Sequence, residues 1–167
     1  MKLTWPWVRK PKNNYFLLAL SILIAQTAGI IGSFFTVPAI SSWYIHLHKP
    51  FFSPPNWLFG PVWILLYTLM GIAAYLVWRA VGFSKKSRTF WVFYSTQLVL
   101  NAWWSFLFFG MHWIGVAFVE ILFLWWSIYR SLREGEKVST MSSNLLYFYL
   151  AWVTFAAALN FALLILN

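Results

Sequence analysis

Residues 89–129 read TFWVFYSTQLVLNAWWSFLFFGMHWIGVAFVEILFLWWSIY, and this stretch decides the fold. It contains one acidic residue, Glu120, and one histidine, His112. As a single helix rising ~1.5 Å per residue it would be about twice as long as the hydrocarbon core of a membrane is thick. The chain must therefore fold back, and Gly110-Met111-His112 is the polar, glycine-bearing break near the middle. The stretch predicts two helices, near residues 90–109 and 113–130.

The composition places the chain in lipid rather than in water. Of 167 residues, 62% are hydrophobic and 9% are charged, whereas a soluble domain has roughly 25% charged residues. The 13 Trp, 17 Phe and 8 Tyr are more than one core of this size could enclose against water. The net charge of +9 would suggest nucleic acid in a soluble protein. However, the basic residues lie between apolar runs, so we expect membrane lipid around the chain and no nucleic-acid partner.

The remaining neutral runs are long enough for further membrane-spanning helices, which need roughly 20 apolar residues. The apolar run that begins at Tyr15 is longer than that of a signal peptide, and no A-x-A site follows it, so we expect this helix to be retained. The fold class is therefore all-α, a polytopic membrane protein with a five-transmembrane-helix bundle. We predict a single domain over residues 1–167 with a binding loop at 37–56 and the remaining helices near 15–36, 57–78 and 144–166.

The basic residues indicate the orientation, because cytoplasmic loops collect Lys and Arg. Five crossings leave Lys49 alone on one side. The other side receives Lys2, Arg9, Lys10, Lys12, Arg79, Lys85, Lys86, Arg88, Arg130, Arg133 and Lys137. We therefore expect an integral membrane protein with a cytoplasmic N-terminus. The absence of a hydrophilic C-terminal tail favours a bacterial cell membrane, and the mitochondrial outer membrane is the alternative.

The loop at 37–56 is predicted to be stiff. Pro50, Pro54 and Pro55 fix φ and remove N–H donors, so the loop should be a pre-shaped cover. Pro54 and Pro55 suit the first turn of the next helix. Its aromatic residues fit either an interfacial belt or a cover over a ligand. His46 and His48 could ligate a metal, but no third ligand is near, so we expect no metal site.

Polar residues inside the helices repeat at helical spacing. Gln97, Asn101 and Ser105 share one face of the third helix, and Asn160 follows Trp152 at the same spacing in the fifth. Amides in hydrocarbon need partners, so both faces should point into the bundle. There the amides either hold helices together or contact a polar ligand group.

Small residues form a similar row in the first helix, at Ala25, Gly29 and Ser33. Such a row permits close helix approach, which could occur inside the bundle or between two copies of the chain.

Glu120 is the exception among the apolar residues of the fourth helix. An acid at that depth is costly and is either functional, as a proton or cation relay, or bonded to a neighbouring helix. The sequence has no Walker, Rossmann, nucleophile-elbow or zincin pattern. It therefore contains no recognisable apparatus for hydrolytic, nucleotide-driven or hydride chemistry.

Four segments carry a resemblance to one family. They are Trp43-Tyr44-x-x-Leu47-x-Lys49-Pro50-x-x-x-Pro54-Pro55-x-Trp57, Gly60-Pro61-Val62-Trp63-x-x-Leu66-Tyr67-x-x-Met70-Gly71, Gln97-Leu98-x-Leu100-Asn101-x-x-Trp104 and Leu145-Leu146-Tyr147-x-Tyr149-Leu150-Ala151-Trp152. In order and spacing they closely resemble the translocator protein family, whose members are also called tryptophan-rich sensory proteins or peripheral-type benzodiazepine receptors. The resemblance runs from about Gly29 to Asn160.

The resemblance implies a five-helix bundle, often a homodimer, with a pocket beneath the first loop. By this resemblance the pocket would bind porphyrins, haem, sterols and synthetic isoquinoline or benzodiazepine ligands, and the protein would sense these ligands or move them across or within the membrane. No cofactor is obligatory, and protoporphyrin or haem is the expected ligand. Carried over by position, the ligand-binding residues are Ser33, Tyr44, Pro54, Trp63, Tyr67, Asn101, Trp104, Trp152 and Ala156.

A porphyrin also agrees with the residue chemistry. A flat apolar macrocycle with carboxylate edges needs aromatic faces and a few polar donors. Three of the tryptophans could provide the faces, and Tyr67 and Asn101 the donors. Lys49 or His48 could pair with a propionate group.

Two other functions stay open. Some bacterial relatives promote the light- and oxygen-dependent breakdown of protoporphyrin, which would make Trp63 and Trp152 the reactive residues of an otherwise non-catalytic protein. A proton-coupled transporter would use Glu120, but five helices do not divide into the equal halves common in transporters.

The sequence also departs from the family in three places. Phe52 and Phe148 stand where the family often has Trp and Pro. The segment after Asn160 lacks the Tyr and the basic residue of the sterol-recognition pattern, so we do not expect cholesterol to bind there.

Overall fold

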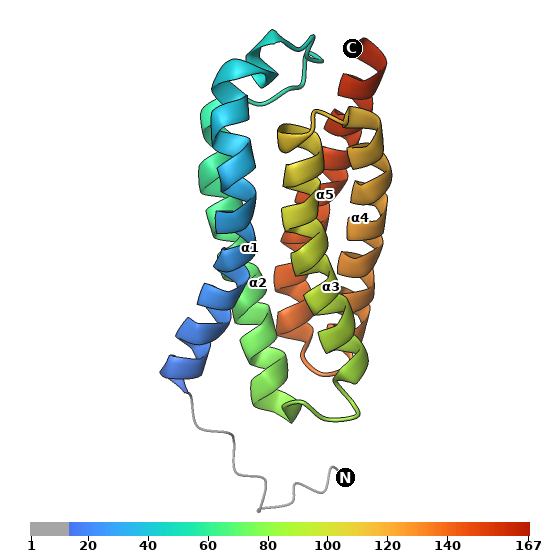
Figure 1. The fold of residues 1–167 in the computed structure, drawn as a ribbon. Helices are drawn as coiled ribbons and strands as arrows, with labels where there is room; N and C mark the ends of the chain where they lie inside the picture. Colours follow the sequence, from blue (N-terminus) through green and yellow to red (C-terminus); the bar gives the residue numbers. More distant parts are fainter. Residues whose placement is uncertain (1–13) are drawn as a thin grey trace, which may run out of the picture.

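The structure, a computed structural model, describes residues 14–167, and these form a bundle of five helices (Figure 1). The helices are α1 (Tyr15–Ser42), α2 (Phe59–Val81), α3 (Arg88–Ser105), α4 (Ile114–Glu136) and α5 (Thr140–Leu166). Consecutive helices are antiparallel. α1 packs on α2 and α3, while α5 packs on α2 and α4. The predicted all-α class and the number of helices are confirmed, and residues 14–167 contain no strand.

The connections alternate between the two ends of the bundle. The start of α1 and the α2–α3 and α4–α5 connections lie at the lower end in Figure 1, and the α1–α2 loop, the α3–α4 turn and the C-terminus lie at the upper end. The predicted basic loops therefore share one end, opposite Lys49. Lys2, Arg9, Lys10 and Lys12, which were predicted on the same side, lie outside the described residues.

Helix composition agrees with a membrane location. The helices Tyr15–Ser42, Asn56–Val81, Ile114–Glu136 and Thr140–Leu166 are long and apolar enough to cross a membrane. α3 is shorter and more polar, but its amide side chains Gln97 and Asn101 are buried inside the bundle. Since lipid does not contact these amides, α3 can still lie within the membrane among the other helices.

The chain folds back at the predicted break. The last turn before it, Phe106–Gly110, is a π-helix, in which the N–H of Met111 donates to the carbonyl of Phe106 at 2.9 Å. His112 has φ of 58°, and its ring stacks on Trp43 at 4.1 Å between centroids. The turn is therefore in contact with the first residue of the α1–α2 connection, Trp43.

The predicted loop 37–56 begins too early. α1 continues through Pro38 to Ser42, where the hydroxyl of Ser42 donates to the Pro38 carbonyl at 2.8 Å. Pro38 frees a single helix carbonyl, that of Phe34, whereas leaving the helix in lipid would expose many more backbone groups. The connection is instead residues 43–58, here called the cover, and it contains two short 3-10 turns, Tyr44–His46 and Asn56–Leu58.

Other helix boundaries also differ from the prediction. α5 begins at Thr140 rather than near 144, and α2 runs from Phe59 to Val81 rather than from 57 to 78. α4 ends at Glu136 rather than near 130, because its last turns carry ion pairs at helical spacing, Arg133–Glu136 and Lys137–Glu134, each at 2.7 Å. Pro55 precedes the turn before α2 in an extended conformation instead of entering the helix.

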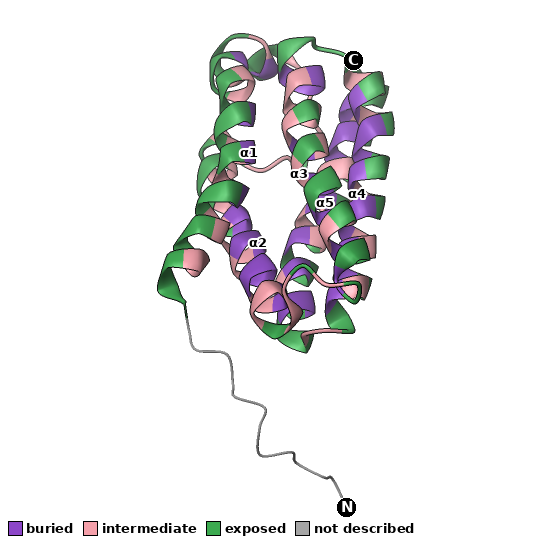
Figure 2. Cartoon of the chain, turned by 60° about the horizontal axis from the view of Figure 1, so that its bottom comes forward, coloured by how far each residue is buried: buried purple, intermediate pink, exposed green. Residues whose placement is uncertain are grey.

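The lower half of the bundle is densely filled. Met70, Val77, Phe90, Ile128 and Leu132 are fully buried, and Figure 2 shows the lower part of α2 as buried while much of α1 is exposed. α1 and α2 touch closely there, since a Cβ on Gly71 would lie 2.8 Å from the backbone nitrogen of Ile22. The upper half is different, because a cavity lies there.

Candidate ligand-binding cavity

A cavity of about 510 Å³ lies beneath the cover, between the upper halves of α1, α2, α3 and α5. Small-molecule sites in proteins occupy roughly 300–1,000 Å³ and are mostly apolar. This wall is largely aromatic and aliphatic, so the cavity has the size and chemistry of a site for an apolar ligand of drug or cofactor size.

The cover is held down over the cavity by Tyr44. This residue is 1% exposed, and its ring packs against Phe59, Phe108 and Phe109 at 5.9–6.4 Å between centroids. Burial raises the pKa of the Tyr44 hydroxyl, so the side chain stays neutral there. The ammonium of Lys49 lies 4.9 Å from the centre of the same ring.

The C-terminal residue also holds the cover. The Asn167 side chain accepts from the His48 N–H at 2.9 Å and donates to the His48 carbonyl at 3.1 Å. Phe52 packs edge-on against Phe155 of α5 at 6.3 Å. These contacts join the cover to α5, so the cavity is closed towards the upper end of the bundle.

Three tryptophans form flat parts of the cavity wall, and each is held by another ring. Trp63 stacks on Tyr67 with centroids 5.6 Å apart, and Trp104 stacks on Phe108 at 5.0 Å. Trp152 packs against Phe155 at 5.3 Å. The three indoles come from α2, α3 and α5, so a planar molecule among them would meet aromatic surface on three sides.

The floor of the cavity is a chain of three hydrogen-bonded side chains. The hydroxyl of Tyr67 donates to Asn101 Oδ1, and Asn101 Nδ2 donates to the hydroxyl of Tyr149 at 2.5 Å. This chain, here called the floor, joins α2, α3 and α5. Asn101 thus joins helices, which is one of the two roles that the sequence left open for it, and it is not among the residues that line the cavity.

Asn160 joins helices and also lies in the cavity wall, whereas its contact with a ligand stays a prediction. Its Oδ1 accepts from the Trp104 indole at 3.1 Å, and its Nδ2 donates to the carbonyl of Ile114 at 3.0 Å. It also lines the cavity. Asn160 therefore fixes the plane of a wall tryptophan while joining α3, α4 and α5.

Trp152 provides a free polar group. Its Nε1 is buried and has no hydrogen-bond partner among residues 14–167. A buried N–H without a partner is costly, and a ligand acceptor would relieve that cost. Since Trp152 lines the cavity, its indole could donate to a bound molecule.

Most of the predicted ligand-binding residues lie in this wall. They are Ser33, Tyr44, Trp63, Tyr67, Trp104, Trp152 and Ala156. Pro54 and Asn101 are not among the lining residues, since Pro54 lies in the cover and Asn101 in the floor. That the wall residues contact a ligand stays a prediction.

Sequence reasoning missed the α1–α2 side of the wall. There the lining includes Gln26, Ile30 and Val37 of α1 together with Gly60 and Ile64 of α2. Helical spacing from Ser33 and Tyr67, which were predicted, is the signal that could have found them.

Two of the three residues in the row of small residues, Ala25 and Gly29, pack inside the bundle, whereas Ser33 is exposed. Ala25 is fully buried. A Cβ on Gly29 would lie 2.7 Å from the ring of Tyr67, and one on Gly32 would lie 2.8 Å from the hydroxyl of Ser105. The absence of a side chain at Gly29 lets Tyr67 reach the floor. The close approach inside the bundle is therefore present at this residue, while contact of the row with a second copy of the chain stays a prediction.

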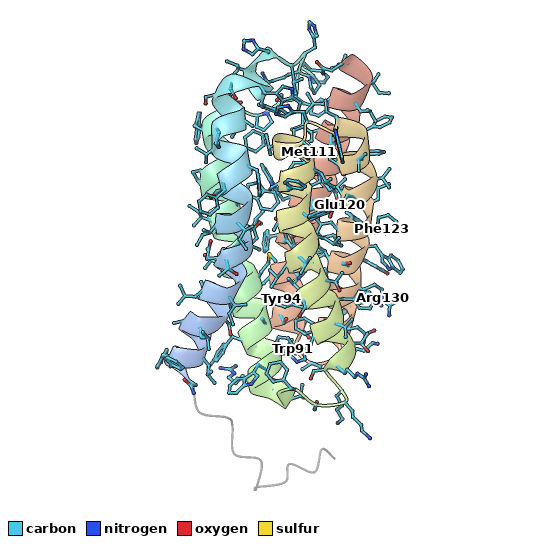
Figure 3. All side chains as sticks on the ribbon, viewed as in Figure 1. Trp91, Tyr94, Met111, Glu120, Phe123 and Arg130 are labelled. Atoms are coloured by element: carbon cyan, nitrogen blue, oxygen red, sulfur yellow. The ribbon has the colours of Figure 1, made fainter. Side chains whose placement is uncertain are left out.

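Glu120 lies in the upper half of α4 (Figure 3), 7% exposed and outside the cavity wall. Neither of its carboxylate oxygens has a hydrogen-bond partner among residues 14–167. The alternative of a structural hydrogen bond to a neighbouring helix is therefore not realised within this part of the chain.

Comparison with known proteins identifies relatives over most of the chain. A family described as the TspO/MBR family matches residues 21–166. Tryptophan-rich protein TspO of Archaeoglobus fulgidus is 45% identical over 154 residues, covering 92% of this chain and 99% of the relative. Translocator protein of Homo sapiens is 37% identical over 145 residues, 86% of each chain. Tryptophan-rich sensory protein of Cereibacter sphaeroides is 34% identical, covering 75% of this chain and 77% of the relative.

Proposed function

Because this chain belongs to the TspO/MBR family and is an integral membrane protein, we propose that it binds porphyrins and related tetrapyrroles in the cavity beneath the cover. In this proposal it senses such ligands or moves them within or across the membrane. Isoquinolines and other flat apolar molecules would occupy the same space.

The observation that carries the proposal is the chemistry of the cavity wall. A porphyrin has two large apolar faces, which stack well on indole rings. Trp63, Trp104 and Trp152 offer such rings from three helices. The N–H of Trp152, which has no partner within residues 14–167, offers a donor to the ring edge, and Lys49 offers a positive charge in the cover. This supports a ligand with an apolar body and acidic groups at one edge.

A titration of the purified protein with protoporphyrin tests the proposal. We expect a saturable shift of the porphyrin absorbance band, and Trp63→Ala and Trp152→Ala should each weaken binding by roughly tenfold, since a lost aromatic contact costs about 1 kcal/mol or more. Trp113→Ala is the matched control, because Trp113 is half exposed and outside the wall. Absence of saturation, or equal effects of all three substitutions, would contradict the proposal.

We further propose that the protein lies in a bacterial cell membrane, with the lower end of the bundle on the cytoplasmic side. We also propose that it forms a homodimer. The charge distribution supports the orientation, because basic residues gather at the lower end. The mitochondrial outer membrane is the alternative. Cysteine labelling can test the sidedness, since the chain has no native Cys. Lys86→Cys should be reached from the cytoplasmic side and Phe51→Cys, which is fully exposed in the cover, from the opposite side.

Light-dependent oxidation of protoporphyrin is a second candidate function. The position of Trp63 and Trp152 in the cavity wall favours it, because an excited porphyrin can exchange an electron with an indole in contact with it, while dissolved O2 is the oxidant that accepts the electrons lost by the porphyrin. In this case porphyrin in aerated, illuminated samples should be consumed faster than with free tryptophan in detergent. Trp152→Phe should slow the consumption more than it weakens binding.

Proton-coupled transport is a third candidate, favoured by the buried carboxyl group of Glu120, which has no hydrogen-bond partner in the described part of the chain. In reconstituted vesicles a pH gradient should then drive ligand uptake, and Glu120→Gln should abolish that dependence. Uptake that responds to neither would exclude it.

A further inference from the structure

Exposure is distributed unequally around the cavity wall. Tyr67, Phe108, Leu159 and Asn160 are buried, and the tryptophans of α3 and α5 are half-buried. The exposed lining residues all belong to α1, to α2 or to the 3-10 turn before α2. They are Ile30, Ser33, Val37, Trp57, Gly60 and Ile64. Surface that merely faces the inside of the cavity would also be exposed on the lining residues of α3 and α5, and these are not exposed. The exposure at α1 and α2 therefore indicates that the cavity opens sideways between these two helices.

The two edges of this opening, here called the slot, are single rows of residues on facing helices. Ile30, Ser33 and Val37 repeat at helical spacing along α1, while Gly60 and Ile64 do so along α2. The exposed fractions of Ile30, Val37 and Ile64 are 56%, 66% and 62%. Apolar edges at this depth of a membrane helix face lipid chains rather than water.

The slot has a defined lower limit. Gln26 of α1 donates from Nε2 to the carbonyl of Ile64 at 3.0 Å and to the hydroxyl of Thr68 at 3.1 Å. Below this bridge the two helices are in contact at Gly71. Above it they separate, since a Cβ on Gly60 would meet nothing within 4 Å.

The upper end of the cavity is closed by contrast. Tyr44 is buried in the cover, and Asn167 joins the cover to α5 through two hydrogen bonds. A ligand that arrived from water would have to break these contacts, whereas a ligand dissolved in the bilayer would meet the open slot.

We propose that the slot between α1 and α2 is an entrance through which a flat apolar molecule dissolved in the membrane reaches the cavity. The inference rests on the proposed function, because it needs a cavity that binds a ligand. It adds the source of that ligand, which is the lipid phase. The class of ligand is a planar amphiphile whose acidic edge stays near Lys49 at the membrane surface while its apolar body passes between the two helices.

Binding kinetics in vesicles test the entrance. The protein is reconstituted in phosphatidylcholine vesicles and mixed with vesicles that contain protoporphyrin, and binding is followed by the porphyrin fluorescence. Gly60→Phe should slow association by roughly fivefold or more and slow dissociation as well, since a narrowed passage affects both directions. Ile64→Ala, which widens the slot, should accelerate both rates.

Val119→Phe is the matched control, because Val119 is 54% exposed on α4 and far from the slot in sequence and structure. It should bind at the wild-type rate. Asn167→Ala, which releases the cover from α5, should change the association rate less than Gly60→Phe does. At constant total porphyrin, added empty vesicles should slow association in proportion to the diluted porphyrin in the lipid.

The outcomes separate the two proposals. Saturable binding with wild-type rates for both Gly60→Phe and Ile64→Ala would overturn the entrance and leave the binding function standing, and so would acceleration by Asn167→Ala alone. If the wild-type protein showed no saturable binding, the proposed function would be wrong, and the entrance, which rests on it, would be wrong as well. Should Gly60→Phe not fold, Ile64→Ala still decides, because it only removes atoms from an exposed side chain.

Discussion

Two glycines on the same face of α2 have opposite surroundings. Gly71 in the lower half touches the backbone of α1 at Ile22, and a Cβ there would collide with it. Gly60 lies about three turns earlier on that face, where a Cβ would meet nothing within 4 Å. The same pair of helices is thus in contact at one end and separated at the other, which shows that the cavity arises from helix divergence and not from small side chains alone.

The floor separates the filled half from the hollow half. Tyr67, Asn101 and Tyr149 are buried, and their hydrogen bonds join three helices directly below the cavity. Below them the core is filled by aliphatic and aromatic side chains. Above them the stacked pairs Trp63–Tyr67 and Trp104–Phe108 hold the wall rings in place. The hollow region therefore has a rigid base and supported walls, as a pre-formed site requires.

The largest expected effect on stability comes from adding a side chain at the glycine where α1 and α2 are in contact. Gly71→Leu should lower the free energy of unfolding by about 3 kcal/mol or more, because the new side chain must push α1 and α2 apart. Gly60→Leu should change it by at most about 1 kcal/mol, and in the stabilising direction, since glycine inside a helix is itself unfavourable. Denaturation in mixed micelles, followed by circular dichroism, measures both. Equal effects would show that the helices do not diverge.

Breaking the floor should have the next largest effect. Asn101→Ala leaves the hydroxyls of Tyr67 and Tyr149 buried without partners, which should cost about 2–3 kcal/mol. Asn144→Ala is the matched control at an exposed position near the start of α5, with an expected change below about 0.5 kcal/mol. The same denaturation measurement applies. A small effect at Asn101 would mean that the two halves are not joined through the floor.

Filling the hollow half should increase stability and remove binding together. Ala156→Leu places additional apolar atoms in the cavity wall, and it should raise the free energy of unfolding by up to about 1 kcal/mol. Porphyrin affinity should fall at least roughly tenfold, because the side chain occupies ligand space. A parallel titration and unfolding experiment checks both. Loss of stability would indicate that this part of the wall is already fully packed.

The sequence predicts the filled half better than the hollow half. The amides at helical spacing correctly predict that Gln97 and Asn101, at and below the floor, lie inside the bundle, since an amide in lipid needs a neighbouring helix. The resemblance leads to the tryptophans of the wall. The slot was not predicted, because Ile30 and Ile64 look like any other lipid-facing residues, and only the angle between α1 and α2 makes them edges of an opening.

Proline also limits what could be predicted for the cover. Pro38 suggests a loop that begins near residue 37, but lipid favours continuing the helix to Ser42. Asn167 and His48 are 119 residues apart in the sequence, and no local pattern predicts the contact between them. Contacts of this kind depend on the completed topology and not on spacing along the chain.

The smallest expected effect concerns that contact. Asn167→Ala removes two hydrogen bonds between α5 and the cover, both at an exposed site, so global stability should fall by no more than about 1 kcal/mol. Local opening is a different quantity, and hydrogen exchange at residues 47–53 should become faster while exchange in the lower half stays unchanged. Asn167→Asp is the matched variant, since it keeps the acceptor for the His48 N–H and loses the donor. It should give intermediate exchange, whereas equal exchange in all three proteins would show that Tyr44 and the surrounding aromatic rings hold the cover without α5.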